Sequence, residues 1–400
     1  MARPPWEVAD VFRLYGADYR DRHGPAMSAQ QHRVMRAIET CRTAALGGHL
    51  EVCDGCGEPR PVYNSCCNRH CPKCQSLAKE RWLKKRLDEL LPVEYFHVVF
   101  TLPNRLAPLA LQNKATVYGL LFEATAETLT RIAADPQHLG AEIGFLAVLH
   151  TWGQRMDAHP HLHCIAPGGG FAPGGERWVS CRPGFFLPVR VLSRLFRGIF
   201  LDRLRRLHRR GKLALHGELA ALSDAGAFEA FLAELRETEW VVYAKRPFGG
   251  PEKVLDYLGR YTHRVAISNH RIVSVDGGKV AFRWRDYRHG SRQRTLTLDA
   301  DEFIRRFLLH VLPTGFHRIR QFGFLANRHR TEKLERARTL LDVVAPLTTA
   351  GAKSAGWEDL LQELTGKDLH LCPHCKVGRM IHLGTLPPDP GHPPEGVDSS

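Results

Sequence analysis

Two Cys-x2-Cys pairs, Cys53 with Cys56 and Cys71 with Cys74, constrain the fold of this 400-residue chain more than any other feature. Fourteen residues separate the pairs, which is close to the spacing of zinc sites in which two short turns each present two thiolates. A bound ion supplies folding free energy to a segment with few apolar residues. The spacing therefore predicts one structural zinc site formed by these four cysteines.

Other cysteines and a histidine near the two pairs leave the ligand set open. In YNSCCNRHCPKCQ, Cys66 or His70 can replace one thiolate or help to hold a second ion, and Cys67 adds a further thiol. Six of the eleven cysteines lie between residues 53 and 74 in close pairs. That distribution favours metal binding in a reducing compartment over a set of disulfides.

A further Cys-x2-Cys motif, Cys372-Pro-His-Cys375, supplies only half of a metal site. Three interpretations remain: it binds metal with His370 or His374, it completes a site through a partner chain, or it holds two free thiols.

The charge balance indicates a polyanionic partner. Lys and Arg number 56 against 42 Asp and Glu, a net charge of +14, and such an excess favours nucleic acid. No apolar run approaches the ~18 residues of a membrane span, and the start, MARPPWEVADVF, lacks the features of a signal peptide. We expect no membrane association and a bacterial cytoplasmic location.

Hydrophobic periodicity predicts a mixed chain of the α+β class. Apolar stripes predict helices over 5–48, 76–91, 105–134, 190–236 and from 251, and β-branched or aromatic runs predict strands over 95–103, 145–154, 161–167 and 240–248. Residues 271–287 read as a hairpin that bends at Asp276-Gly277-Gly278. Residues 345–356 are predicted to form a linker, and 386–400 a disordered tail.

Alternating histidines in AHPHLHCIAPGGG predict a second metal site. On a strand, His161 and His163 share one face, so both imidazoles point to the same place. If 145–154 pairs with 161–167 across a turn near Asp157, Gln154 stands opposite His161. We therefore expect His161, His163 and Gln154 to bind a divalent ion, the alternative being a solvated histidine patch.

Two tyrosines one helical turn apart, Tyr257 and Tyr261, are candidate nucleophiles. A tyrosine hydroxyl can attack a phosphodiester once a metal ion has polarised the phosphate, although the same spacing also suits a core aromatic pair. Residues 260–294 contain nine Lys or Arg against two Asp. This mixture of cations and aromatic rings suits single-stranded DNA. The predicted DNA-binding residues are Arg260, Arg264, Arg271, Arg283, Arg285 and Trp284.

Four blocks in this order resemble the rolling-circle transposases of the insertion-sequence-91 family, which belong to the two-tyrosine HUH endonucleases. They are YNSCCNRHCPKCQ, HTWGQRMDAHPHLHCIAPGGG, YLGRYTHRVAISN and GFHRIRQFGFLAN. The resemblance extends from about residue 30 to 380.

The resemblance implies a helical, zinc-binding DNA-recognition domain over residues 1–91. A catalytic domain with an antiparallel sheet flanked by helices would follow over 92–343, and the linker, the Cys-x2-Cys element and the tail over 344–400. His161 and His163 match the HUH metal motif, Tyr257 and Tyr261 match the nucleophile pair, and FTLP (100–103) resembles the first-strand motif. Cys67 departs from the family pattern.

The implied activity is the nicking and rejoining of single-stranded transposon ends through 5′-phosphotyrosine intermediates, with Mg²⁺ or Mn²⁺ as catalytic ion and Zn²⁺ as structural ion. The chain contains no G-x4-G-K-[ST] phosphate loop, so strand separation would come from a host helicase or from replication. Two alternatives remain: a non-catalytic zinc-dependent DNA-binding protein, and a rolling-circle replication initiator.

Overall fold

The computed structural model describes residues 4–87, 89–245, 253, 259, 265–342, 368 and 370–389. The chain divides into two compact units. The cysteine unit comprises Met1–Arg81, His263–Val311 and Leu347–Ser400, and the sheet unit comprises Trp82–Thr262 and Leu312–Pro346. Each unit is described separately below.

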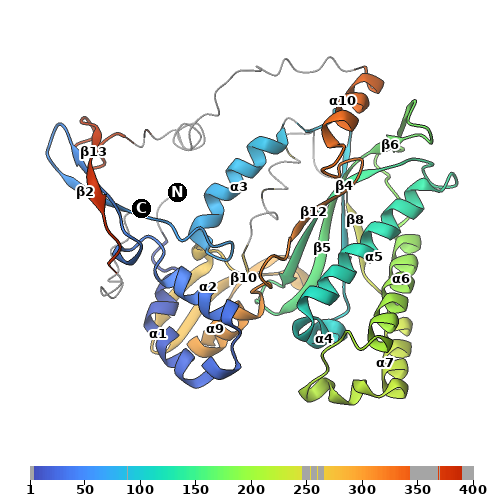
Figure 1. Cartoon of the computed structure of the whole chain (residues 1–400), viewed down its shortest axis with the longest axis horizontal. Coiled ribbons are helices and arrows are strands. Elements are labelled where there is room, and N and C mark those ends of the chain that lie inside the picture. Colours follow the sequence, from blue (N-terminus) through green and yellow to red (C-terminus); the bar gives the residue numbers. More distant parts are fainter. Residues whose placement is uncertain are drawn as a thin grey trace. The chain divides into compact units, whose positions relative to one another are not determined.

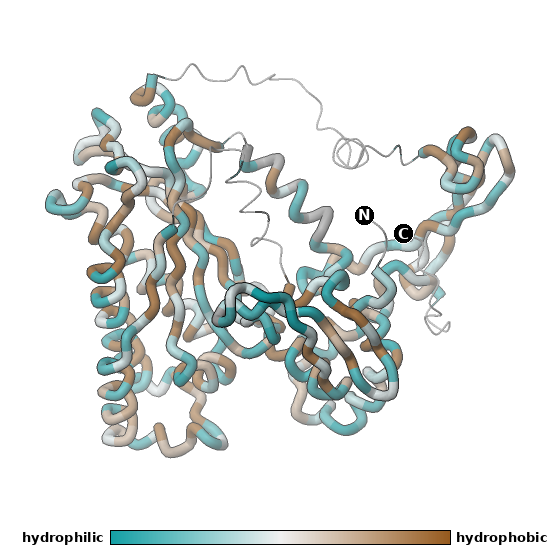
Figure 2. Tube along the Cα trace, turned by 180° about the vertical axis from the view of Figure 1, so that it is seen from behind, coloured by the Kyte–Doolittle hydropathy of each residue, from teal (hydrophilic) through white to brown (hydrophobic). Residues whose placement is uncertain are grey.

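The sheet unit contains a five-stranded antiparallel sheet in the order β12-β4-β5-β3-β8 (Figure 1). Its strands are β3 (Tyr95–Thr101), β4 (Gly144–Trp152), β5 (Ala158–Pro167), β8 (Val242–Lys245) and β12 (Ile319–Gly323). The central strand β5 pairs with β4 on one side and with β3 on the other. Hydrophobic stretches along these strands are visible in Figure 2.

Helices share a core with one face of this sheet. They are α4 (Ala107–Gln112), α5 (Lys114–Ala134), α6 (Val189–Arg209) and α7 (Ala225–Glu237). Phe100, Leu149 and Leu162 point to this side, and the Phe100 ring meets Phe196 of α6 with centroids 5.1 Å apart. Because side chains alternate along a strand, the histidines of β5 point to the other face.

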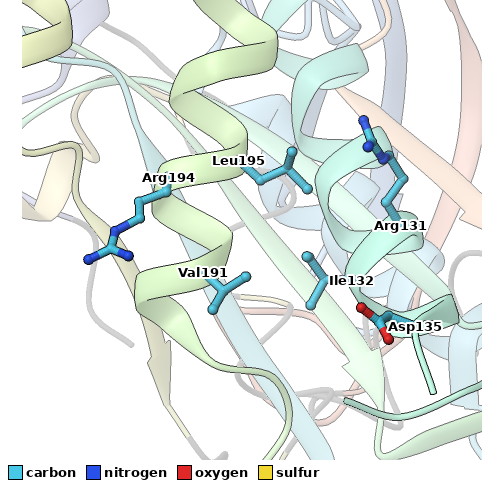
Figure 3. A pocket seen from close by; sticks show the side chains of 6 residues that line it. All are labelled: Arg131, Ile132, Asp135, Val191, Arg194 and Leu195. Atoms are coloured by element: carbon cyan, nitrogen blue, oxygen red, sulfur yellow. The ribbon is translucent and has the colours of Figure 1, made fainter. Parts of the chain in front are cut away.

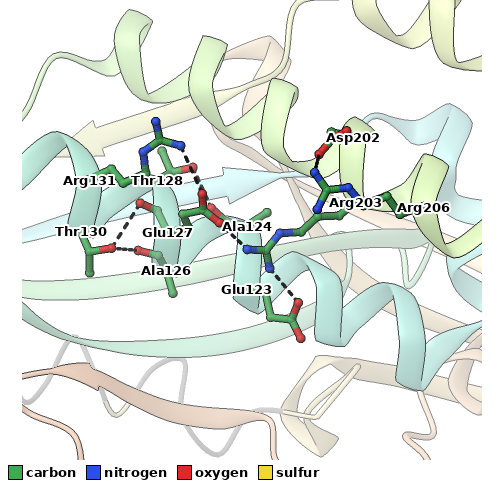
Figure 4. Close-up of polar contacts among 10 residues, drawn as sticks. All are labelled: Glu123, Ala124, Ala126, Glu127, Thr128, Thr130, Arg131, Asp202, Arg203 and Arg206. Carbon is green, nitrogen blue, oxygen red and sulfur yellow. Dashed lines mark hydrogen bonds and ion pairs between the residues drawn. The ribbon is translucent and has the colours of Figure 1, made fainter.

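Charged residues join α5 to α6 outside this core. Arg203 of α6 binds Glu123 at 2.8 Å and also pairs with Glu127, which Arg131 contacts from one turn away (Figure 4). Elsewhere between the two helices, Ile132 and Leu195 line a shallow hollow (Figure 3). This hollow lies on the helical side of the sheet and not on the histidine side.

The opposite face of the sheet is partly covered by the end of α3 (Pro72–Leu87). Leu83 packs with Leu146, Val148 and Ile165 of the sheet. The sheet unit also contains the small β6 (Gly169–Phe171) and β7 (Trp178–Ser180) pair and helix α10 (Arg330–Leu340).

In the cysteine unit, two helices pack against a second antiparallel sheet and its helix. The elements are α1 (Val8–His23), α2 (Ala29–Glu39), β9 (Ile272–Asp276), β10 (Lys279–Asp286), β11 (Arg292–Asp299) and α9 (Ala300–Leu309). The Phe12 ring of α1 meets Phe307 of α9 at 5.3 Å, edge to face. One turn earlier on the same face of α9, Phe303 contacts Phe282 of β10.

The cysteine unit also holds a three-stranded sheet in the order β13-β1-β2 (Figure 1). β1 (Gly48–Cys53) lies between β2 (Pro59–Tyr63) and β13 (Met380–Leu386), and both pairings are antiparallel. Residues from the two ends of the sequence therefore form one small sheet.

The α+β prediction is confirmed, with antiparallel sheets, helices and a cysteine-rich N-terminal region. The expected boundaries 1–91, 92–343 and 344–400 differ from the observed division, because residues 263–311 and the C-terminal stretch cluster with the N-terminal residues. Residues 380–386 form a strand, so the predicted tail begins where β13 ends. The predicted linker at 345–356 lies outside the described residues, as do residues 390–400.

Candidate metal centres

Three histidines converge on the sheet face opposite the helices. His161 and His163 lie on β5, and His150 lies on β4 directly opposite His161. One ring nitrogen from each of the three lies within 4.8 Å of the others. The Nε2 atoms of His161 and His163 are 3.1 Å apart. At metal–nitrogen bond lengths of about 2.0–2.1 Å, two nitrogens this close can both bind a single ion.

Hydrogen bonds to the Nδ1 atoms orient the rings of His161 and His163. Nδ1 of His161 lies 2.6 Å from the backbone oxygen of His159, so Nδ1 donates and Nε2 of the neutral ring keeps its lone pair. Nδ1 of His163 lies 2.8 Å from Nε2 of His97 on β3. In both rings the Nδ1 atom makes the orienting contact, so Nε2 faces the other histidines of the cluster and is available to bind a metal ion.

The protonation of the site also suits a metal ion. Burial lowers the pKa of His161 to about 4, with a smaller effect of His159. Burial likewise lowers the pKa of His97 to about 4, with smaller effects of His161 and Lys245. These rings are neutral at pH 7, and only a neutral imidazole can ligate a metal.

The first group of thiols surrounds the start of α3. Cys41, Cys66, Cys71 and Cys74 bring their sulfurs within 4.8 Å of one another. The Sγ of Cys74 is 3.6 Å from those of Cys41 and Cys66. Interactions with Cys41 and Cys66 lower the pKa of Cys74, and its position in the first turn of a helix also favours the thiolate.

The second group of thiols lies at the β13-β1-β2 sheet. Cys53, Cys56, Cys372 and Cys375 bring their sulfurs within 4.8 Å of one another. Sγ–Sγ distances are 3.7 Å from Cys53 to Cys375 and 3.8 Å from Cys56 to Cys372. Backbone N–H groups of Gly378 and Val377 lower the pKa of Cys375 to about 6.

The predicted single zinc site is therefore corrected. Cys53 and Cys56 lie in one cluster and Cys71 and Cys74 in the other. Local spacing does not reveal the distant members, which are Cys41 in one cluster and Cys372 and Cys375 in the other. Cys66 belongs to the first cluster, as one alternative allowed.

His70 and Cys67 lie outside both clusters. The buried His70 contacts Asn68 through Nδ1 at 3.3 Å, and the exposed Cys67 contacts Ser65. His370 and His374 are likewise not members of the four-thiol groups.

Comparisons with known proteins identify the family of the chain. A family model described as "putative transposase" matches residues 144–333, and one described as "transposase zinc-binding domain" matches residues 11–102. The chain is 61% identical over 383 residues to "putative transposase y4qJ" of Sinorhizobium fredii, which covers 96% of each chain. The chain belongs to the insertion-sequence-91 family of transposases.

A more distant relative supports the same assignment. The transposase is 28% identical over 309 residues to the "transposase for insertion sequence element IS801" of Pseudomonas savastanoi pv. phaseolicola, across 76% of this chain and 73% of that protein. No solved structure matches it. None of the helices in the described ranges is long and apolar enough to cross a membrane.

The expected register of the hairpin, with Gln154 opposite His161, is wrong. The β4–β5 hairpin places His150 opposite His161, and Gln154 lies in the connecting turn. The turn closes where Gly153 N–H donates to the oxygen of Asp157 at 2.9 Å. The Asp157 carboxylate also lies close to Gly153, 2.7 Å from the position that a Cβ would take there.

The expected nucleophiles of the transposase, Tyr257 and Tyr261, lie outside the described residues, as do Arg260 and Arg264. The other predicted DNA-binding residues belong to the β9–β11 sheet or border it. Arg283 and Arg285 are exposed on one face of β10. Trp284 points to the other face of β10, the face on which Phe282 lies. Trp284 and the two arginines therefore do not form one DNA-binding surface.

Arg271 supports the sheet itself. Its Nε donates to the backbone oxygen of Arg283 at 2.7 Å, and its guanidinium lies 5.5 Å from the Phe282 ring centroid.

Sequence reasoning missed His150, His97 and Cys41. His150 lies in the predicted strand 145–154, four residues before Gln154, and this even spacing places both residues on one strand face. His97 lies in another predicted strand, and no local pattern links it to the histidine hairpin. Cys41 is a lone cysteine after a helix, with no neighbouring pair to mark it.

Proposed function

We propose that this transposase nicks and rejoins single-stranded transposon ends through 5′-phosphotyrosine intermediates, at a divalent ion held by His150, His161 and His163. The observation that carries the proposal is the convergence of three imidazoles on adjacent strands of an antiparallel sheet. The family assignment supports DNA as the substrate.

The donor set fits a divalent ion, and it favours one of the two expected ions. Replacing the expected amide oxygen of Gln154 with the imidazole of His150 makes all three protein donors nitrogen. Imidazole donors suit transition metals, whereas Mg²⁺ prefers oxygen and retains several waters. The catalytic ion proposed is therefore Mn²⁺ in preference to Mg²⁺.

A bound ion supplies Lewis acidity that stabilises the negative charge developing on the scissile phosphate. The rings of His161 and His163 are held by His159 and His97, so the donors need little rearrangement before the phosphate arrives. The role assigned to Tyr257 or Tyr261 is attack on phosphorus through the phenol oxygen. The new bond joins tyrosine to the 5′ phosphate, the bond to the 3′ oxygen breaks, and that oxygen takes up a proton to give a free 3′-OH.

A phosphotyrosine bond conserves the energy of the phosphodiester, so rejoining needs no nucleotide cofactor. A second tyrosine, one helical turn away if residues 251–264 are helical, can attack while the first still holds its DNA end. The proposed cycle therefore assigns separate roles to Tyr257 and Tyr261.

The single-stranded end is proposed to bind to the cysteine unit through the exposed face of the β9–β11 sheet. Arg283 and Arg285 lie there beside Gln293 and Thr295 of β11, which are their strand partners. The two guanidinium groups supply phosphate contacts, and the polar partners supply hydrogen-bond donors. Unwinding is left to a host helicase or to replication.

Covalent trapping tests the proposal. Full-length protein is incubated with labelled single-stranded DNA carrying candidate ends and Mn²⁺, and the adduct is digested and mapped by mass spectrometry. We expect DNA on Tyr257 or Tyr261, loss of one adduct in each single Tyr→Phe variant, and no adduct in the double variant. DNA attached to another residue would refute the nucleophile assignment. DNA binding without any adduct, on verified ends, would favour a non-catalytic DNA-binding protein.

A further inference from the structure

The second thiol cluster is built from two stretches of sequence that are far apart. Cys53 ends β1 and Cys56 follows it, whereas Cys372 and Cys375 precede β13. Cys375 lies 322 positions after Cys53 in the sequence. The zinc-binding family model ends at residue 102, so half of this cluster lies beyond it. β1 pairs with β13 from Gly48–Leu386 to Cys53–Met380, which brings the two Cys-x2-Cys turns together (Figure 1).

The two turns have the same backbone design. In each turn, the oxygen of the first cysteine accepts a hydrogen bond from the N–H four residues later: Cys53 from Gly57 and Cys372 from Lys376, both at 3.0 Å. The residue after the second cysteine has positive φ in both turns, +73° at Gly57 and +58° at Lys376. A lysine rarely adopts this conformation, so the surrounding structure must enforce it.

Backbone N–H groups also point at the sulfurs. Gly55 and Cys56 donate to Sγ of Cys53 at 3.4 Å, and Gly378 donates to Sγ of Cys375 at 3.3 Å. Hydrogen bonds of this kind favour the negatively charged thiolate over the thiol. A tetrahedral ion needs thiolate ligands, so both turns are arranged to provide them.

The turns also pack closely through glycine. A Cβ on Gly378 would lie 2.5 Å from Sγ of Cys53 and 2.8 Å from the backbone nitrogen of Gly55. Asp54 fixes this contact, because its N–H donates to the oxygen of Arg379 at 3.0 Å and its carboxylate accepts from the Arg379 N–H at 2.7 Å. The approach of the two turns is therefore specific.

Apolar side chains contribute little to holding this sheet together. Its small buried cluster consists of Cys53, Cys372 and Met380, with Cys375 packed beside them. Ile381 and Leu383 of β13 are instead 52% and 64% exposed. A small sheet whose interior is mostly sulfur needs another source of folding free energy, which a metal ion supplies in zinc domains.

We propose that Cys53, Cys56, Cys372 and Cys375 bind a structural zinc ion, so that the C-terminal residues 370–386 complete a zinc ribbon begun by residues 48–63. The site is separate from the one formed by Cys41, Cys66, Cys71 and Cys74. Its zinc joins the two ends of the chain, and the whole sheet unit lies between them in the sequence. Tetrahedral thiolates also suit a single iron ion, which the test distinguishes.

The experiment measures metal content in full-length protein purified under reducing conditions without chelator, by elemental analysis and native mass spectrometry. The Cys372→Ser/Cys375→Ser variant is expected to hold one zinc fewer than the unmodified chain. Cys67→Ser, which removes an exposed thiol outside both clusters, is expected to keep the full zinc content. Equal zinc in the Cys372→Ser/Cys375→Ser variant and the unmodified chain, or a red protein with iron in this site, would overturn the proposal.

A second pair of variants leaves every ligand in place. Gly378→Ala introduces the clash with Cys53 and is expected to lose the same zinc ion. Gly384→Ala in β13 is the matched control, because a Cβ there meets nothing within 4 Å, and it should retain the ion. Equal zinc content in these two variants would contradict the packing argument.

A cut-chain experiment covers the case in which the cysteine variants do not fold. A specific protease site is inserted within residues 345–356 of the otherwise unmodified chain, and the chain is cleaved after folding. We expect the C-terminal fragment to remain bound on size-exclusion chromatography and to dissociate when zinc is chelated. Retention of the fragment after complete removal of zinc, or its release with zinc still bound, would count against the zinc ribbon.

Discussion

His150 of β4 and His161 of β5 are direct partners across two antiparallel strands. This pairing makes His150 the third donor of the proposed catalytic site. His150→Ala should reduce Mn²⁺-dependent cleavage of single-stranded ends at least about 100-fold while changing DNA affinity little, because affinity depends mainly on phosphate contacts elsewhere. Cleavage of labelled DNA and a binding titration in chelator measure the two effects.

Gln154→Ala is the matched control for this prediction. Gln154 belongs to the same hairpin but lies in its turn, so cleavage should fall less than about threefold. The opposite ranking of the two variants would show that the amide and not the imidazole completes the site.

An all-imidazole site should prefer Mn²⁺ to Mg²⁺. We expect half-maximal cleavage at a Mn²⁺ concentration at least about tenfold below that of Mg²⁺, because nitrogen donors favour the transition metal. His150→Asp introduces a carboxylate oxygen, so it should reduce the ratio between the half-maximal concentrations of Mg²⁺ and Mn²⁺. Equal half-maximal concentrations in the unmodified enzyme would argue against the three-nitrogen site.

His97 should act through His163 as a positioning residue. Its Nε2 contacts Nδ1 of His163 at 2.8 Å, so His97→Phe removes the partner that fixes the ring of that ligand. Loss of such a partner typically weakens metal binding about 10–100-fold. A Mn²⁺ titration monitored by electron paramagnetic resonance measures this shift. His97→Gln, which retains a hydrogen-bonding group, should recover part of the affinity, whereas a merely structural role would give similar values for both variants.

Local sequence patterns were sufficient to predict most strands and the face on which the histidines lie. The predicted pairing of Gln154 with His161 differs from the observed pairing of His150 with His161 by four residues. An even slip preserves the face of the sheet, so His150 lies on the face expected for Gln154. The strand register is set by the position of the turn, which closes between Gly153 and Asp157. The pattern of apolar and polar residues along a strand does not predict where this turn closes.

The cysteine clusters show a different limit. Both Cys-x2-Cys pairs were recognised, but their assignment to one ion assumed that neighbours in sequence share a site. The other members of the two clusters, Cys41 and Cys372 among them, are brought in by tertiary packing. Sequence spacing predicts which residues form a metal-binding turn, and only the fold determines which two turns meet.

The first thiol cluster should depend on Cys41. Cys41→Ser is expected to lower the zinc content by one ion and to destabilise the start of α3, because three thiolates remain where a structural site requires four ligands. Zinc analysis and hydrogen exchange over residues 64–80 measure both effects. Cys67→Ser should leave both unchanged, and an identical response of the two variants would exclude Cys41 as a ligand.

The exposed face of β10 should provide phosphate contacts. Changing Arg283 and Arg285 together to alanine should weaken binding to single-stranded DNA for every sequence. It should also reduce the slope of log affinity against log salt by about 0.7 for each lost phosphate contact. Fluorescence anisotropy at several salt concentrations measures the slope. Arg294→Ala is the control on the opposite face, where Arg294 pairs with Asp286 at 3.2 Å, and an equal loss of slope there would contradict a one-sided surface.

Because β1 pairs with β13, the three-stranded sheet can form only late in synthesis on the ribosome. Cys53 emerges 322 residues before Cys375. At about 5–20 residues per second, this interval lasts roughly 15 to 65 s. Until then β1 has only β2 as a partner, and an isolated two-stranded hairpin is marginally stable in water. During this interval one edge of β1 lacks its strand partner, and the thiols of Cys53 and Cys56 lack the two cysteines that complete their cluster.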